Sequence, residues 1–222
     1  MMRSPFIPAF PDLPDEMPVF PLSGAVVMPG VQLPLNIFEP RYLSMVQAAL
    51  ASDHMIGMVQ PVNSDGESSD QPALHRIGCA GRITSYSETN DGRIIMVLTG
   101  ICRFAVGEEL SPVDGYRRVR PDWRGFEGDY ADDESPLPER DRFLSSLRNF
   151  CDQRGVEVPW DDLEKMADGE LINLLCAHLP LVADDKQALI ETVDLGERAQ
   201  LMRGLMDMSA LASGGVAAEQ RH

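Results

Sequence analysis

Short apolar runs separated by proline and glycine fill residues 17–123, a pattern typical of compact β structure. Over residues 31–37 apolar and polar side chains alternate, which predicts a strand with one buried face. Pro34 lies within this segment, and proline has no backbone N–H to donate to a neighbouring strand. We therefore expect residues 31–37 to form an edge strand or to lie near a bulge.

A single helix interrupts these strands. Pro40 is placed to begin it, and apolar residues at helical spacing continue to near Ser52. The turn at residues 90–92, Asn-Asp-Gly, tolerates positive φ and predicts a hairpin. Many short strands with one helix indicate a closed or nearly closed β-barrel. The predicted strands are residues 18–22, 25–28, 31–37, 55–59, 79–88, 93–99, 102–109 and 116–123.

The second half of the chain has helical periodicity, which predicts a small bundle of four or five helices. Gly155 and Pro180 are placed to end two of the helices. Asp161, Asp184 and Asp194 each precede a Glu or Gln by three residues, the spacing of a capping box. The apolar stripes are Phe143, Leu144, Leu147, Phe150 and Cys151, then Leu171, Leu174 and Leu175, then Met202, Leu205 and Met206.

These patterns divide the chain at an acidic, proline-containing stretch. The predicted parts are a proline-rich segment (1–16), a β domain (17–124), an acidic linker (125–138), a helical bundle (139–212) and a disordered tail (213–222).

The charge balance narrows the choice of partners. Acidic residues outnumber basic ones by 35 to 19, for a formal charge of −16. Binding to phosphate-rich surfaces normally requires a basic face, so the composition disfavours nucleic acid and membranes. An RNA-binding alternative rests on one cluster, Arg117, Arg118, Arg120 and Arg124.

Catalytic motifs are absent: the chain has no GxxxxGK[ST], HExxH, GxSxG or GxGxxG. We therefore expect no enzyme, no cofactor and no metal. A Cys-dependent enzyme using Cys79 or Cys102, with His75 near Cys79, is the open alternative. An acidic run could also coordinate a divalent cation, although such a run is usually a solvated linker. Its members are Asp132, Asp133 and Glu134.

The most distinctive local pattern is at the predicted strand-to-helix corner, Phe38, Glu39, Arg41 and Tyr42. As a binding site, the two aromatic rings would anchor an extended peptide between a carboxylate and a guanidinium. As structure, Glu39 would cap the helix, Arg41 would bind a neighbouring carbonyl or carboxylate, and the rings would fill the barrel mouth.

Five segments follow one another along the first half of the chain: PVFPL (18–22), PG (29–30), PLNIFEPRY (34–42), IGCAGRI (77–83) and GICRF (100–104). In this order they resemble the N-terminal substrate-binding domain of Lon proteases. The second half is similar to the helical extension of that family in LPL (179–181), DKQALIE (185–191) and Glu197-Arg198.

This resemblance implies an α+β fold: a PUA-like β-pseudobarrel with one enclosed helix, followed by a C-terminal helical bundle. The chain resembles stand-alone bacterial LON-domain proteins that lack ATPase and peptidase domains. The implied function is non-catalytic binding of unfolded or exposed polypeptide segments. Residues 1–17 contain no apolar run like the core of a signal peptide, and no window approaches 18 uncharged apolar residues, so we expect a cytoplasmic protein. A homodimer formed through apolar helix faces is a further possibility that the sequence leaves open.

Overall fold

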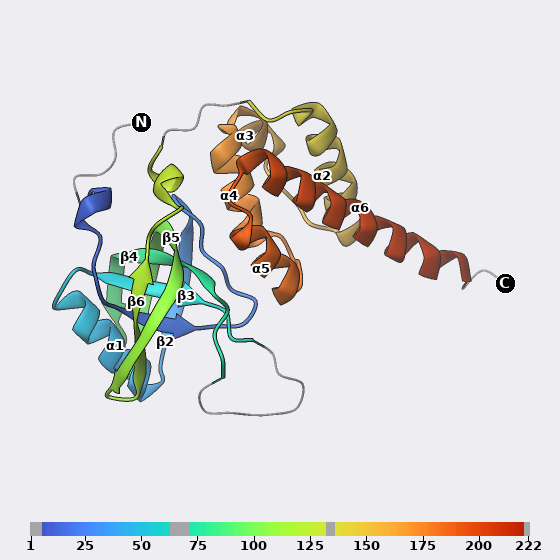
Figure 1. Cartoon of the computed structure of the whole chain (residues 1–222). Helices are drawn as coiled ribbons and strands as arrows, with labels where there is room; N and C mark the ends of the chain where they lie inside the picture. The colour runs from blue at the N-terminus through green and yellow to red at the C-terminus, as the bar shows by residue number, and fades with distance from the viewer. Residues whose placement is uncertain (1–5, 63–71, 132–135, 220–222) are drawn as a thin grey trace.

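A computed structural model describes residues 6–62, 72–131 and 136–219. The N-terminal part is a β-barrel with one helix, and the C-terminal part is helical (Figure 1). The described strands are β1 (Met17–Pro21), β2 (Gln32–Ile37), β3 (Met55–Val59), β4 (Ile77–Glu88), β5 (Ile94–Val113) and β6 (Tyr116–Asp122). The described helices are α1 (Pro40–Leu50), α2 (Arg140–Arg154), α3 (Trp160–Lys165), α4 (Asp168–His178), α5 (Ala183–Glu191) and α6 (Leu195–Glu219), with short 3₁₀ helices η1 (Phe10–Asp12) and η2 (Glu127–Tyr130).

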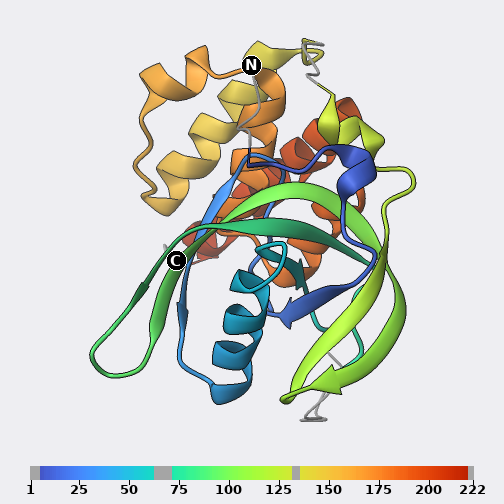
Figure 2. The ribbon, with the colours of Figure 1, turned by 90° about the vertical axis from the view of Figure 1, so that its left-hand side faces the viewer.

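The six strands form one mixed sheet in the order β2-β5-β4-β3-β1-β6. β1 and β3 run parallel, and the other pairs are antiparallel. β5 is long enough to pair with β2 and β4 in its first half and with β6 in its second half. This double pairing curls the sheet into a pseudobarrel (Figure 2) and confirms the expected α+β fold.

One continuous apolar core joins the barrel to the bundle. Met45 and Val46 of α1, Met96 and Leu98 of β5, and Leu147 of α2 belong to the same buried cluster and are almost fully inaccessible. A second buried cluster fills the rest of the barrel around Phe104. The bundle is therefore packed directly against the barrel.

The structure corrects two strand predictions. Residues 25–28 form no strand, although Val26, Val27 and Met28 are buried one after another. The Pro29-Gly30 turn follows directly, and this segment packs through its side chains instead of pairing along a neighbour. Residues 93–99 and 102–109, predicted as two strands, form the single strand β5. Ile101 is an extra residue in the ladder, because Ala80 pairs with Cys102 while Gly81 pairs with Gly100.

Helix ends also differ from the predictions. Asp194 accepts the Glu197 N–H at 2.8 Å and caps α6 as expected. Asp161 and Asp184 lie inside the first turns of α3 and α5, where they face the positive end of the helix dipole rather than capping it. α6 is described as far as Glu219, and residues 220–222 lie outside the described residues. The disordered tail at 213–222 stays a prediction.

We predict that Gly100→Ala destabilises the protein by about 1–3 kcal/mol. A Cβ at this position would lie 2.1 Å from the Met28 carbonyl oxygen, which is backbone and cannot move aside. Urea unfolding measures the change. Gly204→Ala is the matched control, because its Cβ would meet nothing within 4 Å in the interior of α6 and should stabilise by about 0.5–1 kcal/mol. Equal effects of the two variants would contradict the close approach at Gly100.

Candidate functional site

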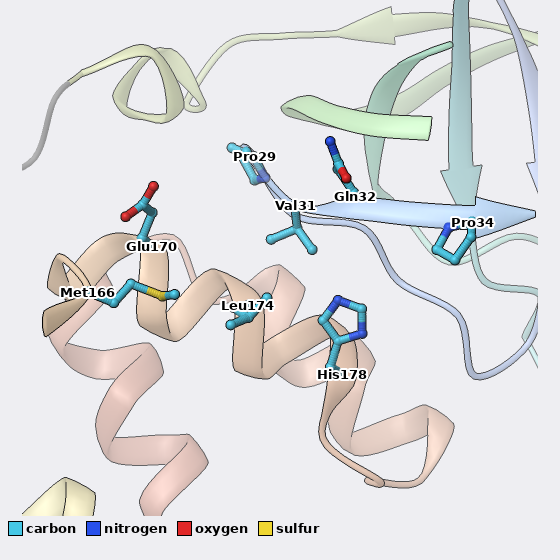
Figure 3. A pocket seen from close by; sticks show the side chains of 9 residues that line it. Pro29, Val31, Gln32, Pro34, Met166, Glu170, Leu174 and His178 are labelled. Atoms are coloured by element: carbon cyan, nitrogen blue, oxygen red, sulfur yellow. The ribbon is translucent and has the colours of Figure 1, made fainter. Parts of the chain in front are cut away.

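A groove of about 460 Å³ lies between the start of β2 and helix α4 (Figure 3). Such a volume is within the roughly 300–1,000 Å³ range of ligand pockets. In Figure 3 α4 runs beside β2, with Leu174 opposite Val31 and His178 opposite Pro34. The lining residues are Pro29, Gly30, Val31, Gln32 and Pro34 on the barrel, and Met166, Glu170, Leu174 and His178 on the bundle.

The barrel wall of the groove is set by a tight turn. The Val31 N–H donates to the Met28 carbonyl at 2.9 Å, and Gly30 at the turn has a φ of +80°. Pro29 and Gly30 suit these two positions, since proline presets its own φ and glycine accepts a positive φ without strain. Gly30 donates to the Gly100 carbonyl, and Gly100 donates back to Val31, each at 2.9 Å. The turn is thereby fixed to β5.

The bundle wall is one stripe of α4. Glu170, Leu174 and His178 recur every four residues and so lie on the same face of the helix. The opposite face, with Leu171, Ile172, Leu175 and Cys176, is buried in the bundle core. Because α4 buries one face and presents the other to β2, its position decides the shape of the groove.

Asn173 ties α4 to the turn that borders the groove. Its Nδ2 donates to the Pro29 carbonyl at 3.1 Å, and its Oδ1 accepts from Arg198 Nη1 at 2.8 Å. Arg198 also donates to the carbonyls of Thr192 and Val193, both at 2.9 Å. Burial lowers the pKa of Arg198 to about 10, so the guanidinium still carries its charge at neutral pH.

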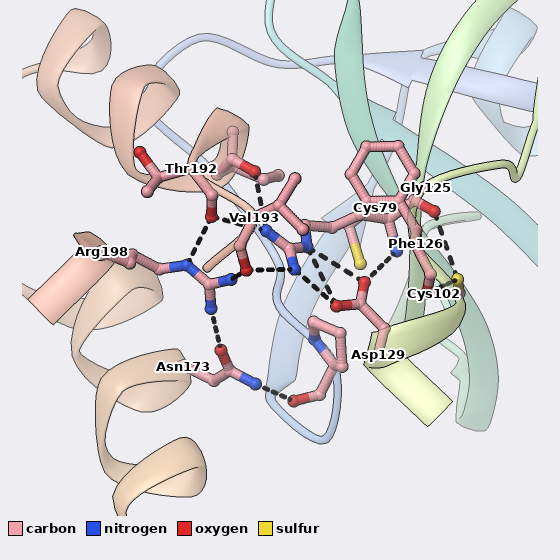
Figure 4. Close-up of polar contacts among 12 residues, drawn as sticks. Cys79, Cys102, Gly125, Phe126, Asp129, Asn173, Thr192, Val193 and Arg198 are labelled. Atoms are coloured by element: carbon pink, nitrogen blue, oxygen red, sulfur yellow. Dashed lines mark hydrogen bonds and ion pairs between the residues drawn. The ribbon is translucent and has the colours of Figure 1, made fainter. Parts of the chain in front are cut away.

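A buried ion pair continues this network into the barrel (Figure 4). Arg103 of β5 binds Asp129 of η2 through Nη2 and Oδ1 at 2.6 Å, and their side chains are only 3% and 7% exposed. The same guanidinium donates to the carbonyls of Thr192 and Ile190 at 2.8 and 3.2 Å. These carbonyls end α5 and begin the link to α6. Arg103 and Arg198 therefore hold that link from two sides.

A second group of polar contacts joins the barrel to the bundle at α5. Gln60 donates to Gln187 at 3.1 Å and accepts from Gly24 at 2.8 Å. Lys186 donates to the carbonyls of Gly24 and Ala177 at 3.1 and 3.0 Å, and burial lowers the pKa of this lysine. These bonds attach α5 to the loop before β2 and cap the last turn of α4.

None of the four residues singled out from the sequence lines the groove. Phe38 is 62% exposed, whereas Tyr42 is buried with its ring centroid 4.4 Å from that of Phe20. Glu39 makes no capping bond and instead pairs with Arg41 at 2.9 Å. The Arg41 guanidinium lies 4.6 Å from the Tyr42 ring centroid. The structure thus keeps Phe38 accessible and gives Tyr42 a packing role.

The cysteines do not form the nucleophile site considered above. Cys79 and Cys102 are fully buried, and burial raises the pKa of Cys79 well above its ordinary value. His75 lies beside Glu191, with Nδ1 and Oε1 4.0 Å apart. Asp132, Asp133 and Glu134 lie outside the described residues, and within the described ranges no three metal-binding side chains converge.

The arginine cluster is neutralised by acidic neighbours. Its ion pairs are Arg117 with Glu109 at 2.5 Å, Arg120 with Glu108 at 2.6 Å, Arg124 with Asp122 at 2.6 Å and Arg118 with Glu16 at 3.5 Å. This arrangement offers no basic face for RNA and does not favour the RNA-binding alternative. Within residues that the structure describes, no helix combines the length and apolar character required to cross a bilayer.

A comparison with known protein families shows which family this chain belongs to. Residues 16–208 match the family model described as the ATP-dependent protease La (LON) substrate-binding domain. The chain belongs to this family. The match includes the barrel, the bundle and both walls of the groove.

Similar proteins include Lon protease 2 of Myxococcus xanthus and the Lon protease of Flavobacterium johnsoniae. Each is 26% identical to this chain, over 200 and 202 residues, which are 88% and 85% of this chain and 24% and 23% of those proteases. The chain thus spans about a quarter of the length of the curated relatives it matches.

Two solved structures share the fold of this LON-family chain. A Lon N-terminal domain protein from Xanthomonas campestris has a TM-score of 0.60 at 24% identity, covering 84% of this chain and 96% of that one. The N-terminal domain of a Mycobacterium avium complex Lon protease has a TM-score of 0.59 at 16% identity, covering 86% and 98%. These likenesses confirm the barrel followed by helices.

The groove was not predicted from the sequence, although the sequence contains signals of the buried polar residues that hold its walls in place. Arg103 and Asn173 each interrupt an apolar stretch, and a polar residue in such a place requires buried partners. Arg198 lies among polar residues and carries no such signal. Leu174 was assigned to the packing stripe of its helix, and the structure places it on the groove wall. Only the packing of α4 beside β2 brings these residues together.

We predict that Asp129→Ala destabilises the protein by about 3–5 kcal/mol, because it leaves the Arg103 guanidinium buried without its carboxylate partner. Equilibrium urea unfolding measures the change. The control is Asp122→Ala, which removes the partner of the exposed Arg124 and should change stability very little. Similar losses in both variants would contradict a special role for the buried pair.

We predict that native protein resists thiol alkylation near neutral pH. Burial raises the pKa of Cys176 to about 12 and also raises the pKa of Cys79, so both remain protonated thiols and are shielded from reagent. Iodoacetamide labelling at pH 7 followed by mass spectrometry should modify these two residues only after denaturation. Rapid labelling of either residue in the folded protein would contradict the prediction, and rapid labelling of Cys79 would support the Cys-dependent enzyme.

Proposed function

We propose that this chain is a non-catalytic module that binds exposed segments of other polypeptide chains. The observation that carries the proposal is the groove between β2 and α4, which lies beside an edge strand and is lined mainly by apolar residues. Val31, Met166 and Leu174 offer apolar contact, while Glu170 and His178 offer polar groups. Binding sites combine these two properties, an apolar body with a few placed polar groups.

The family supports this reading. The matching model is described as a substrate-binding domain of an ATP-dependent protease, and the substrates of a protease are polypeptides. A protein that presents unfolded segments exposes apolar side chains that are normally buried, and these suit the apolar groove walls. The module would act by holding such segments, in the cytoplasm, without altering them.

The surface around Phe38 is a second contact region in this proposal. Phe38 is the anchor there, flanked by the Glu39–Arg41 pair, while Tyr42 is buried and packs on Phe20. Ile95 is 51% exposed and pairs with Asn36, two residues before Phe38. Exposed apolar residues near one another favour protein contact.

The test uses an unfolded protein whose reduced cysteines are blocked with iodoacetamide, a neutral reagent that adds no charge opposed to this acidic chain. Fluorescence anisotropy should show binding to this probe and not to its native, oxidised form. Leu174→Ser removes apolar contact from the groove and should weaken binding about tenfold, corresponding to about 1.4 kcal/mol.

Val182→Ser is the matched control, because Val182 also lies in the bundle, is 66% exposed and does not line the groove. Phe38→Ser measures the contribution of the second surface. Thermal melting of each variant excludes unfolding as the cause of lost binding. Equal binding to the native and unfolded forms, or equal effects at Leu174 and Val182, would overturn the proposal.

A further inference from the structure

We propose that the bound segment adds to the outer edge of β2 as an extended strand, inside the groove between β2 and α4. This inference rests on the proposed function and specifies its ligand: an extended backbone with apolar side chains at alternate positions and a lysine or arginine. Three features of the groove support it: an open strand edge, an apolar wall and an acidic side chain.

The edge of β2 is open. β2 lies at one end of the strand order, and within the described part of the chain it pairs with β5 only. Gln32, Pro34 and Asn36 are exposed. Gln32 and Pro34 also line the groove, so the edge and the groove are the same place.

The register shows which backbone groups turn outward. In an antiparallel ladder, residues whose N–H and C=O meet the partner strand alternate with residues whose groups point away. Val31 is a bonded position, because its carbonyl accepts the Gly100 N–H. The ladder then runs without a shift from Gln32 opposite Thr99 to Ile37 opposite Ile94. The backbone N–H and C=O groups of Leu33 and Leu35 therefore face β5, and those of Gln32, Pro34 and Asn36 face the open edge of β2.

Pro34 agrees with this assignment. Proline has no N–H, so at a position facing β5 it would remove a ladder bond, whereas at an outward position it costs no bond within the sheet. The outward groups available to a partner strand are the N–H of Gln32 and Asn36 and the C=O of Gln32, Pro34 and Asn36. No hydrogen bond in the described part of the chain uses them.

The opposite wall suits the side chains of an added strand. Successive side chains of a strand point to opposite faces, so alternate residues would meet Leu174 on α4 and Met166, which lies between α3 and α4. Main-chain bonds supply affinity in this mode of binding, and the side-chain contacts supply selectivity. Figure 3 shows both walls running alongside one another.

Charge selects a basic segment. Glu170 lines the groove, is exposed, and forms no ion pair with any residue that the structure describes. The whole chain carries a formal charge of −16, so a segment rich in Asp or Glu is repelled and one with Lys or Arg is attracted.

Amide hydrogen exchange followed by NMR tests the strand addition, with the same iodoacetamide-blocked unfolded protein as the probe. At saturation the amides of Gln32 and Asn36 should exchange at least about tenfold more slowly, since each acquires an acceptor. The amides of Leu33 and Leu35, already bonded to β5, should change little. Unchanged exchange at Gln32 and Asn36 in the presence of bound probe would overturn strand addition and leave the proposed function standing.

Two pairs of variants test the same edge without NMR. Gln32→Pro and Asn36→Pro each remove one outward N–H, while Gln32→Ala and Asn36→Ala keep it. Each proline variant should bind the probe about three to ten times more weakly than its alanine counterpart, the value of one net hydrogen bond. Melting curves identify folded variants, and the second position serves if the first fails to fold. Equal affinity within both folded pairs would contradict the proposal.

A separate binding measurement tests the preference for a basic segment. Acetylating the lysines of the probe should weaken its binding to the wild-type chain several-fold at low salt, and Glu170→Gln should reduce that difference. A probe that never binds the wild-type chain would end both the proposed function and this inference. A probe that binds equally well with and without acetylation would remove the basic residue from the ligand description.

Discussion

The buried Arg103–Asp129 pair is the interaction on which the rest of the structure depends. It joins β5 to η2, and the same guanidinium holds the carbonyls at the end of α5. A guanidinium satisfies several acceptors in fixed directions, which lysine cannot do. Since a buried charge without partners is costly, the bundle is stable only where these acceptors meet Arg103. This requirement orients the bundle on the barrel.

The groove is a consequence of that orientation. Arg198 extends the network from the α5–α6 link to Asn173, and Asn173 reaches the Pro29 carbonyl beside β2. One wall therefore comes from residues near 30 and the other from residues near 170, and the polar network sets the distance between them. Membership of the LON substrate-binding family gives this groove its functional interest. The network itself performs no chemistry, and it positions the two surfaces that a ligand would touch.

Much of the fold could be predicted because local patterns agree with it. Pro34 marked β2 as an edge strand, Pro40 began α1, and Gly155 ended α2 with a positive φ of 64°. Local patterns failed where a distant segment intervened. β5 continues through Gly100, which lies against the Met28 carbonyl. Asp129, within the predicted acidic linker, binds the distant Arg103.

The sequence by itself determined the β-then-helix order, the apolar faces of the helices, the family resemblance and the lack of familiar catalytic motifs. These depend on periodicity and on residues close together in the chain. Only the tertiary structure decided that Tyr42 is buried while Phe38 is exposed, that the arginine cluster is neutralised, and that Leu174 faces β2. The reason is physical: burial, ion pairing and groove walls arise between segments far apart in sequence, and their positions follow from packing rather than from local propensity.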